Sequence, residues 1–330
     1  MSTLLSSTTA NYASLNSDQA RSLLLGVALG DALGVPVEFQ DRAARQQDPV
    51  TEMRGYGTYW QPAGTWSDDA SLTFCLAEAL ADGFTLENLA ANCVRWWRQA
   101  WWTAHGQVFD IGITTAESLR RLEQGVPAAQ AGGRREGDNG NGALMRILPL
   151  LGRLSFDPAQ AAAEFRLVQD VADLTHGHVR SAAACWLYLS AAHWLRTGYS
   201  PAEAYNRLRQ EGLATLRHLG VAEEEVVHFG PLLGGDLATW PEDRVQSGGY
   251  VLHTLEAALW CLLRHNTYAD TVLAAVNLGY DTDTTSAVAG GLAGLYYGEA
   301  SFPAEWLALL ARRTDIEALA SRMEAGLGHP

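Results

Sequence analysis

The chain has 330 residues, of which 48% are hydrophobic, and its formal net charge at pH 7 is −14. This length and apolar content can form one large domain or two ordinary ones, and the acidic balance argues against a general nucleic-acid binder or a binder of anionic membranes. All 23 basic residues are arginine. Mechanisms that need a Schiff-base lysine, a lysine base or a Walker-type lysine on a phosphate are therefore excluded.

Residues 1–17 are rich in Ser, Thr and Asn and lack the basic n-region of a signal peptide. We expect them to form a disordered tail before a domain that spans residues 18–330. The apolar run over residues 23–29 leads directly into GDALG and is too short to cross a membrane. The sequence therefore predicts no membrane association.

Apolar residues recur at i, i+3, i+4 and i+7 along much of the chain, which predicts helices. The clearest segments are residues 70–83, 87–102, 159–174, 180–196, 248–265 and 286–298. Alternating runs typical of strands are missing, and clusters of Gly, Pro, Asn and Asp separate the helical segments. Because no internal repeat or linker interrupts the pattern, we expect one compact all-α domain.

The four cysteines are widely spaced, each lies in an apolar helical context, and none forms a CxxC pair. We expect Cys75, Cys93, Cys185 and Cys261 to be buried free thiols, as in a reducing cytoplasm. The sequence therefore favours a cytoplasmic protein. The acidic surface and the lack of a zipper pattern favour a monomer.

Acidic residues gather in three unusual places: Asp31 and Glu38 in LGVALGDALGVPVEF, two aspartates in GTWSDDASLTF, and two more in GYDTDTTSAV. Each has an ordinary structural explanation. Ser67 can cap a helix whose first turn holds acids, Asp281 can do the same, and Asp31 is expected to cap or brace the first helix and orient the site. Both later helices run into tightly apolar sequence, however, so their N-termini are expected in the interior or in a cleft.

Carboxylates buried together repel one another and resist ionisation. With no lysine in the chain and no arginine within several residues of either Asp pair, a divalent cation is the simplest partner. All-oxygen ligands select Mg²⁺, Mn²⁺ or Ca²⁺ rather than zinc, and the available oxygens suffice for two ions about 4 Å apart that orient a substrate and activate a water. An EF-hand is excluded, because DTDTTSAVAGGL lacks the glycine at position 6 and the acid at position 12.

From residue 21 to residue 298 the chain resembles the ADP-ribosylglycohydrolase family, the group that contains dinitrogenase-reductase-activating glycohydrolase and the ADP-ribosyl-acceptor hydrolases. Six motifs occur in the family's order. They are GVALGDALGVPVE (26–38), WSDD (66–69), FDIGITT (109–115), GNGALMR (140–146), TH (175–176) and DTDT (281–284). The resemblance implies an all-α enzyme that cleaves the bond between ADP-ribose and an acceptor.

Position by position, the resemblance implies a binuclear Mg²⁺ or Mn²⁺ site. Its expected ligands are Ser67, Asp68, Asp69, Asp281, Asp283 and Thr284. Glu38 matches the acid beside the metals and the scissile bond, and Glu38 or a ligand aspartate such as Asp283 is expected to take the proton of the attacking water. The expected substrate contacts are Asp110, Gly112, Gly140, Asn141, Gly142, Ala143, His176 and Tyr280.

Three positions depart from the family pattern. Ala70 stands where Thr is frequent, Tyr280 replaces a frequent Gly and can narrow the pocket, and Ala143 replaces a frequent Ser and removes one hydrogen bond to substrate. Because no lysine is present, pyrophosphate must be held by backbone N–H groups, His176 or an arginine. Arg146 is placed for that role, although a structural salt bridge is an equally good interpretation of it.

The expected reaction is metal-assisted attack of water at ribose C1″, which releases ADP-ribose through an oxocarbenium-like state. Arginine-linked ADP-ribose is the favoured substrate, by analogy with bacterial relatives. Serine-linked ADP-ribose, O-acetyl-ADP-ribose and modified nucleic acid remain open as acceptor classes. Two other functions also remain open: a non-catalytic member that binds ADP-ribose or a toxin, as an immunity protein or a crystallin does, and a hydrolase of free ADP-ribosyl metabolites.

Overall fold

The structure, a computed structural model, describes residues 15–327, and in this range it contains α-helices and short 3-10 turns but no β-strand. The α-helices are α1 (Ser17–Gly34), α2 (Arg42–Gln47), α3 (Asp68–Ala81), α4 (Leu86–Gln99), α5 (Ile113–Glu123), α6 (Ala161–Asp173), α7 (Val179–Arg196), α8 (Pro201–His218), α9 (Glu223–Val226), α10 (Gly230–Gly234), α11 (Val251–Arg264), α12 (Tyr268–Asn277), α13 (Thr282–Tyr297), α14 (Ala304–Leu309) and α15 (Arg313–Leu327). The predicted all-α class is confirmed.

The six helices predicted from periodicity are α3, α4, α6, α7, α11 and α13. The largest boundary difference is at α13, which begins at Thr282 instead of residue 286. Another is at α4, which ends at Gln99 instead of residue 102. Ala100 takes a left-handed conformation there, with φ of 53°, and this conformation interrupts the helical hydrogen bonds. The next turn brings the buried Trp102 against Phe74 of α3, with ring centroids 5.1 Å apart.

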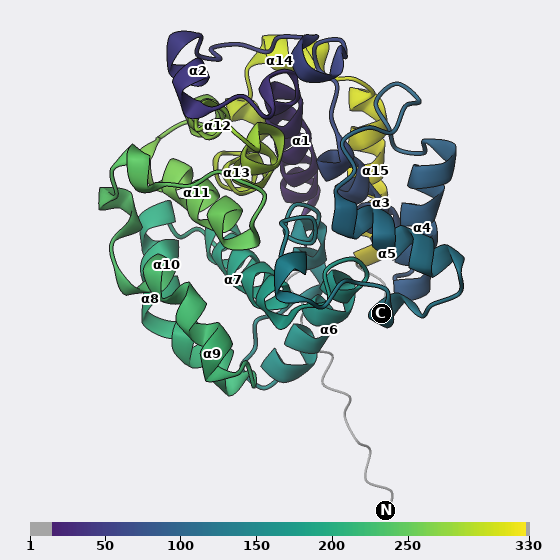
Figure 1. Ribbon diagram of the computed structural model, residues 1–330, viewed down its shortest axis with the longest axis vertical. Helices are drawn as coiled ribbons and strands as arrows, with labels where there is room; N and C mark the ends of the chain where they lie inside the picture. Colours follow the sequence, from purple (N-terminus) through teal and green to yellow (C-terminus); the bar gives the residue numbers. More distant parts are fainter. Residues whose placement is uncertain (1–14, 328–330) are drawn as a thin grey trace, which may run out of the picture.

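Helices α1 and α13 lie side by side in the middle of the molecule and form its most extensive helix pair, although they are separated by nearly the whole chain (Figure 1). Their contact surface is built from small residues. A Cβ atom added to Gly26 would lie 2.5 Å from the carbonyl oxygen of Gly290, and one added to Gly30 would lie 2.1 Å from that of Ser286. The two backbones therefore touch directly, which only glycine at these positions allows.

Side-chain hydroxyls from α12 and α13 donate hydrogen bonds to the backbone of α1. Three carbonyl oxygens spaced four residues apart on α1, those of Gly26, Gly30 and Gly34, each accept one such bond. The donors are the hydroxyls of Tyr268 (2.7 Å), Ser286 (2.7 Å) and Thr282 (2.8 Å). The N-terminus of α13 is in this way fixed against the C-terminus of α1.

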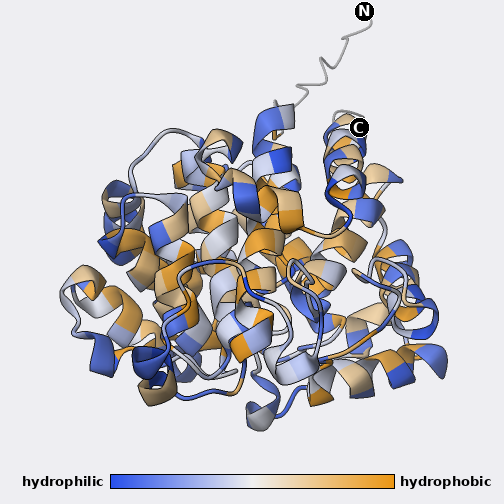
Figure 2. Ribbon diagram, turned by 90° about the horizontal axis from the view of Figure 1, so that it is seen from above, coloured by the Kyte–Doolittle hydropathy of each residue, from blue (hydrophilic) through white to orange (hydrophobic). Residues whose placement is uncertain are grey.

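The remaining helices surround this pair. Helices α12 and α11 pack against α13, α3 and α15 pack against α1, and α7 connects the pair to α6 and α8. Hydrophobic residues gather on the central helices, and hydrophilic residues lie toward the outside (Figure 2). By length and composition the segment Ser17–Val37 is apolar enough to cross a membrane, but 94% of its most apolar window is buried inside the protein, as in a core helix.

The tail predicted over residues 1–17 lies mostly outside the described residues. Its last three residues belong to the folded domain. Leu15 is fully buried, and the Asn16 side chain accepts a hydrogen bond of 2.8 Å from the N–H of Gln19, which caps α1 at its first residue, Ser17. Residues 15–17, which the prediction assigns to the tail, are therefore part of the described fold.

Candidate active site and metal centre

The N-terminus of α3 carries the first pair of acids, and its cap is more elaborate than the predicted serine cap. Ser67 accepts from the N–H of Asp69 at 3.3 Å and donates to its Oδ2 at 3.0 Å. The buried Asp31 carboxylate accepts from the N–H groups of Ser67 (2.8 Å) and Ala70 (2.9 Å). Asp31 therefore caps α3 and not the first helix, and in doing so it locks α1 to the acids of α3.

Glu38 follows the 3-10 turn η1 (Val35–Val37) at the end of α1, and it lies beside Asp110. The hydroxyl of Tyr59, from the turn η2 (Gly57–Tyr59), contacts Glu38 Oε2 at 2.7 Å and Asp110 Oδ1 at 2.5 Å. A phenol has one proton and donates to one carboxylate at a time. A protonated Glu38 satisfies both contacts, because it donates to the phenol oxygen while the phenol donates to Asp110.

The N-terminus of α13 supplies the last acids. Asp283 is fully buried, and its Oδ1 accepts from the N–H of Thr284 at 2.9 Å. The Thr284 hydroxyl lies 3.3 Å from Asp69 Oδ2, so it joins the α13 and α3 parts of the site. Asp281 Oδ2 accepts from the Asn141 side chain at 2.8 Å.

The structure brings these acids together in three overlapping groups whose carboxylate oxygens lie within 4.8 Å of one another. The groups are Asp31 with Asp69 and Asp283, Glu38 with Asp110 and Asp283, and Asp68 with Asp69 and Asp110. Asp69, Asp110 and Asp283 each belong to two groups and form the centre. Asp281 belongs to none of them, so the structure places this predicted ligand at the edge of the cluster. Asp110, predicted as a substrate contact, lies inside it.

Three carboxylate oxygens of the site are buried without a hydrogen-bond partner: Asp69 Oδ1, Asp281 Oδ1 and Asp283 Oδ2. Within residues 15–327, no ion pair involves any acid of the site. Buried carboxylate oxygens without a donor or a positive charge are costly. The donor set, which consists of carboxylate and hydroxyl oxygens, fits a hard divalent cation, and the unpartnered oxygens mark where its ligands are available.

Burial is the main cause of the raised pKa values in the site, and repulsion between the carboxylates adds to it. The pKa of Asp31 rises to about 7 and that of Glu38 to about 9. The pKa values of Asp68, Asp69 and Asp283 rise well above the ordinary aspartate range, and those of Asp110 and Asp281 rise too. The cluster therefore holds protons at neutral pH unless a cation replaces them.

The glycine-rich loop over residues 140–143 adjoins the acids and packs on His176. A Cβ added to Gly142 would lie 2.7 Å from Cε1 of the His176 ring, so the ring fits only beneath a glycine. Asn141 connects the loop to the acids through Asp281. Burial lowers the pKa of His176 to about 3, so its imidazole is neutral and offers a hydrogen bond instead of a positive charge.

Arg146 lies in neither of its two predicted places. Its guanidinium is fully buried and donates to the carbonyl of Val171 (3.0 Å) and to the hydroxyl of Thr175 (2.9 Å). It has no carboxylate partner among the described residues, so the predicted salt bridge is absent there. The Thr175 hydroxyl also contacts His176 Nδ1 at 2.9 Å. Arg146 is therefore a fully buried donor that reaches His176 only through the Thr175 hydroxyl.

The other predicted substrate contacts differ in accessibility. Ala143 is fully buried and packs in the core, so its side chain does not reach a ligand. Gly112 is exposed at the start of α5. Tyr280 is 50% exposed beside Asp281. Tyr59 was not predicted, because nothing in the local sequence GYGTYW distinguishes it from an ordinary turn residue.

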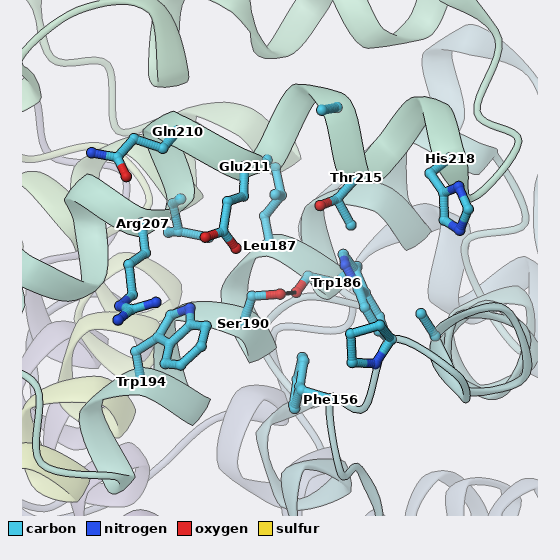
Figure 3. A pocket seen from close by; sticks show the side chains of 15 residues that line it. Phe156, Trp186, Leu187, Ser190, Trp194, Arg207, Gln210, Glu211, Thr215 and His218 are labelled. Carbon is cyan, nitrogen blue, oxygen red and sulfur yellow. Dashed lines mark hydrogen bonds between the residues drawn. The ribbon is translucent and has the colours of Figure 1, made fainter.

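A separate cavity of about 470 Å³ lies between α7, α8 and the segment before α6 (Figure 3), and none of the acids of the site lines it. Phe156, Trp186 and Trp194 form much of its wall, and Arg207 stacks on Trp194 with its guanidinium carbon 4.4 Å from the ring centroid. No group of carboxylates lines this cavity. The cavity has room for a ligand but no cluster of acids that could hold a metal or transfer a proton, so the acid cluster remains the candidate site.

Comparison with known proteins supports this assignment. The sequence profile of the ADP-ribosylglycohydrolase family matches residues 12–329. An ADP-ribosylarginine hydrolase, Tri1, from Pseudomonas putida is 31% identical over 93% of this chain and 78% of its own length. The ADP-ribosyl-[dinitrogen reductase] glycohydrolase of Rhodospirillum rubrum is 32% identical over 91% of this chain and 92% of its own.

Among solved structures, one described as an ADP-ribosylglycohydrolase-related protein complex superimposes with a TM-score of 0.70 at 31% identity, over 94% of this chain and 98% of that one. The match in sequence and the match in fold cover the same, nearly complete, length of chain. The predicted resemblance and the predicted enzyme class are thus confirmed, and the chain belongs to the ADP-ribosylglycohydrolase family.

Proposed function

We propose that this enzyme releases ADP-ribose from arginine-linked acceptors and that two hard divalent cations, Mg²⁺ or Mn²⁺, occupy the acid cluster. The observation that carries the proposal is the convergence of the α3 and α13 N-termini, which brings Asp69 and Asp283, each with a buried unpartnered oxygen, within 4.8 Å of other carboxylates. The expected ligands are Asp68, Asp69 and Asp283, with Asp281 and the hydroxyls of Ser67 and Thr284 beside them. When bound, such cations orient ribose hydroxyls and lower the pKa of a coordinated water.

Glu38 is the group that handles the proton. It lies 4 residues beyond the end of α1, next to Asp283 and Asp110, and Tyr59 fixes the position of its carboxyl group. Its high pKa has burial as the first cause and the Asp110 charge as the second. Positive charge in the cluster lowers this pKa, so that the carboxylate can accept a proton from the attacking water at neutral pH. Asp31 only positions the site, since both its oxygens are used to cap α3.

The loop over residues 140–142 and His176 are expected to receive the rest of ADP-ribose. Glycine at positions 140 and 142 keeps the backbone free of side chains, and the neutral His176 ring lies under both positions. Backbone N–H groups in such a loop can hold phosphate oxygens without lysine. Asn141 connects this loop to Asp281, so the nucleotide end and the ribose end of the site share one support.

Arginine as the acceptor is supported by the relatives. The Pseudomonas putida protein and a second one from Serratia proteamaculans, 31% identical over 93% of this chain, are both named ADP-ribosylarginine hydrolases. A guanidinium-bearing acceptor also suits a site that is rich in carboxylates, none of which has an ion-pair partner within residues 15–327. We further propose a cytoplasmic monomer; the four cysteines are free and buried, as expected of a protein in a reducing compartment.

The test is release of free ADP-ribose from an arginine-ADP-ribosylated protein with Mg²⁺ or Mn²⁺, followed by chelator. We expect chelator to abolish release and Asp283→Ala to lose both activity, by at least about 10³-fold, and cation binding measured by calorimetry. Asp18→Ala is the matched control, because Asp18 is also an acid in a first helical turn but its side chain is exposed. An active Asp283→Ala enzyme that binds no cation contradicts the mechanism. Release from a serine-linked protein alone contradicts the choice of acceptor.

A further inference from the structure

Exposed aromatic residues lie on the loops that carry or adjoin residues of the acid cluster. Seven large hydrophobic side chains are exposed among the described residues, and five of them lie on the loops that carry or adjoin Glu38, Tyr59, Asp110 and Asp281. These five are Phe39 (68% exposed), Tyr56 (60%), Trp60 (80%), Ile113 (81%) and Tyr280 (50%). Scattered single apolar residues need no explanation, but a concentration beside one site does. We call Phe39, Tyr56, Trp60 and Tyr280 the aromatic rim.

The aromatic rim is built into the same loops as the acids. Phe39 directly follows Glu38, and Tyr280 directly precedes Asp281. Phe39 donates its N–H to the carbonyl of Tyr280 at 2.7 Å, and Tyr280 donates its N–H to the carbonyl of Gln40 at 2.6 Å, so the two loops are joined. The ring of Phe39 is 6.4 Å from that of Tyr59, the residue bonded to Glu38 and next to Trp60. The rings of the aromatic rim therefore lie on loops that carry Glu38 and Asp281 or contact Glu38 through Tyr59.

All four residues of the aromatic rim have a positive φ angle, which L-residues rarely adopt. Their φ angles are 63° for Phe39, 67° for Tyr56, 55° for Trp60 and 64° for Tyr280. Bulky residues rarely adopt such angles, because the Cβ atom crowds the backbone, and a glycine or asparagine fits there with less strain. Burial of the rings would offset this cost, but the rings are exposed. The fold alone therefore does not account for aromatic residues at these four positions, whereas strain of this kind is typical of binding sites.

We propose that the aromatic rim is a docking surface for the polypeptide that carries the ADP-ribosyl group, so that the enzyme selects modified proteins over free ADP-ribosyl metabolites. The inference rests on the proposed function. The scissile bond lies at the acids, so the acceptor side of the substrate extends toward the rim. A small acceptor such as free arginine is too short to cover several exposed rings, whereas a polypeptide segment flanking the modified residue can. Aromatic side chains on rigid loops are the usual anchors of such contacts.

The test compares two substrates, an arginine-ADP-ribosylated protein and free ADP-ribosylarginine, with wild-type enzyme and Trp60→Asn. Asparagine tolerates the left-handed conformation, so this variant removes the ring without adding backbone strain. We expect KM for the modified protein to rise about tenfold relative to KM for ADP-ribosylarginine. The melting temperature should stay the same or rise, because a merely structural tryptophan would lower it on removal. Val227→Asn is the control: Val227 is 56% exposed but lies on a turn next to α9.

If KM rises equally for both substrates in Trp60→Asn, or changes for neither, the proposal that the aromatic rim docks the polypeptide is overturned. If wild-type enzyme releases ADP-ribose from neither substrate, the proposed function fails, and docking is then judged by binding alone. In that case affinity for the intact modified protein is compared with affinity for free ADP-ribose, and an unchanged ratio in Trp60→Asn overturns the inference.

Discussion

The helix pairs α1–α13 and α7–α8 differ in the atoms that make contact where the helices pack together. Between α1 and α13 the nearest neighbours of a glycine Cβ are backbone atoms, such as the Ser286 carbonyl oxygen 2.1 Å from a Cβ on Gly30. Gly212 of α8, by contrast, faces flexible ends of side chains, with Leu187 Cδ2 of α7 at 3.3 Å and Leu233 Cδ1 of the adjoining α10 at 2.8 Å. The first contact is rigid and the second is adjustable.

This difference explains why the acid cluster lies at the α1–α13 pair and not at the cavity beside α7 and α8. Rigid backbone contact fixes the N-terminus of α13 relative to α1 and, through Asp31, to α3, so carboxylates from three helices meet within a few ångströms. The side-chain packing around α7 and α8 leaves a cavity of about 470 Å³ but does not converge acids on a point. A large cavity is therefore a poorer guide to this active site than a tight helix crossing.

Of the substitutions that test this comparison, Gly30→Ala should have the largest effect on stability and activity. Its Cβ meets a carbonyl oxygen that cannot move away, so α1 and α13 must separate, at a cost of about 3 kcal/mol in the free energy of unfolding, and activity should fall with the geometry of the acids. Gly212→Ala is the matched control, because leucine ends can rotate and alanine favours the helix; its stability should change by less than about 1 kcal/mol. Chemical denaturation measures both. Equal effects of the two substitutions contradict the rigid-contact interpretation.

The pH dependence of stability should show an intermediate effect. Burial raises the pKa of Asp31 to about 7 and that of Glu38 to about 9, while the unfolded chain releases these protons near pH 4. Their contribution to stability is therefore full below pH 4 and is lost as pH rises through 7 and 9. In chelator, the melting temperature should fall by several degrees from pH 5 to pH 9. With Mg²⁺ or Mn²⁺ it should fall less, and superimposable curves with and without cation would exclude binding at the cluster.

Thr215→Val should have the smallest effect. Thr215 lies on α8 and lines the cavity of Figure 3, where it is half-buried. Valine has nearly the same shape, so we expect the melting temperature to stay within about 1 °C and activity within about twofold. A tenfold loss of activity would connect the cavity with the acid site and end the distinction between the two regions.

Much of the fold was predictable because its helices are apolar segments separated by turn residues. Apolar residues face one side in α4 and α6, whereas α3, α7 and α13 are buried on nearly every face. The end of α4 was not predictable, since a left-handed Ala100 has no sequence signal. Among the candidate site residues, Asp68, Asp69 and Asp283 were identified by their position in helical first turns that lead into buried sequence. The structure assembles them with Asp31 and Glu38.

The remaining details of the site depend on contacts between distant segments. Tyr59 joins Glu38 to Asp110 from a turn whose sequence looks ordinary, and Asp31 caps a helix that begins 37 residues later in the chain. Ala143 matches the family motif by position, yet it is fully buried. A sequence pattern shows which residue types are present in a loop, but burial and pairing across the fold decide which of their atoms face a ligand.

The pairing of α1 with α13 also sets when the enzyme can become active during its synthesis. Glu38 and Asp283 are 245 residues apart, which at ordinary translation rates corresponds to roughly ten to fifty seconds. Until α13 leaves the ribosome, the glycine face of α1 has no partner helix, and the Glu38 carboxyl lacks its neighbour Asp283. A growing chain is therefore incapable of hydrolysis, and its long, apolar first helix depends on late contacts or on chaperones for protection.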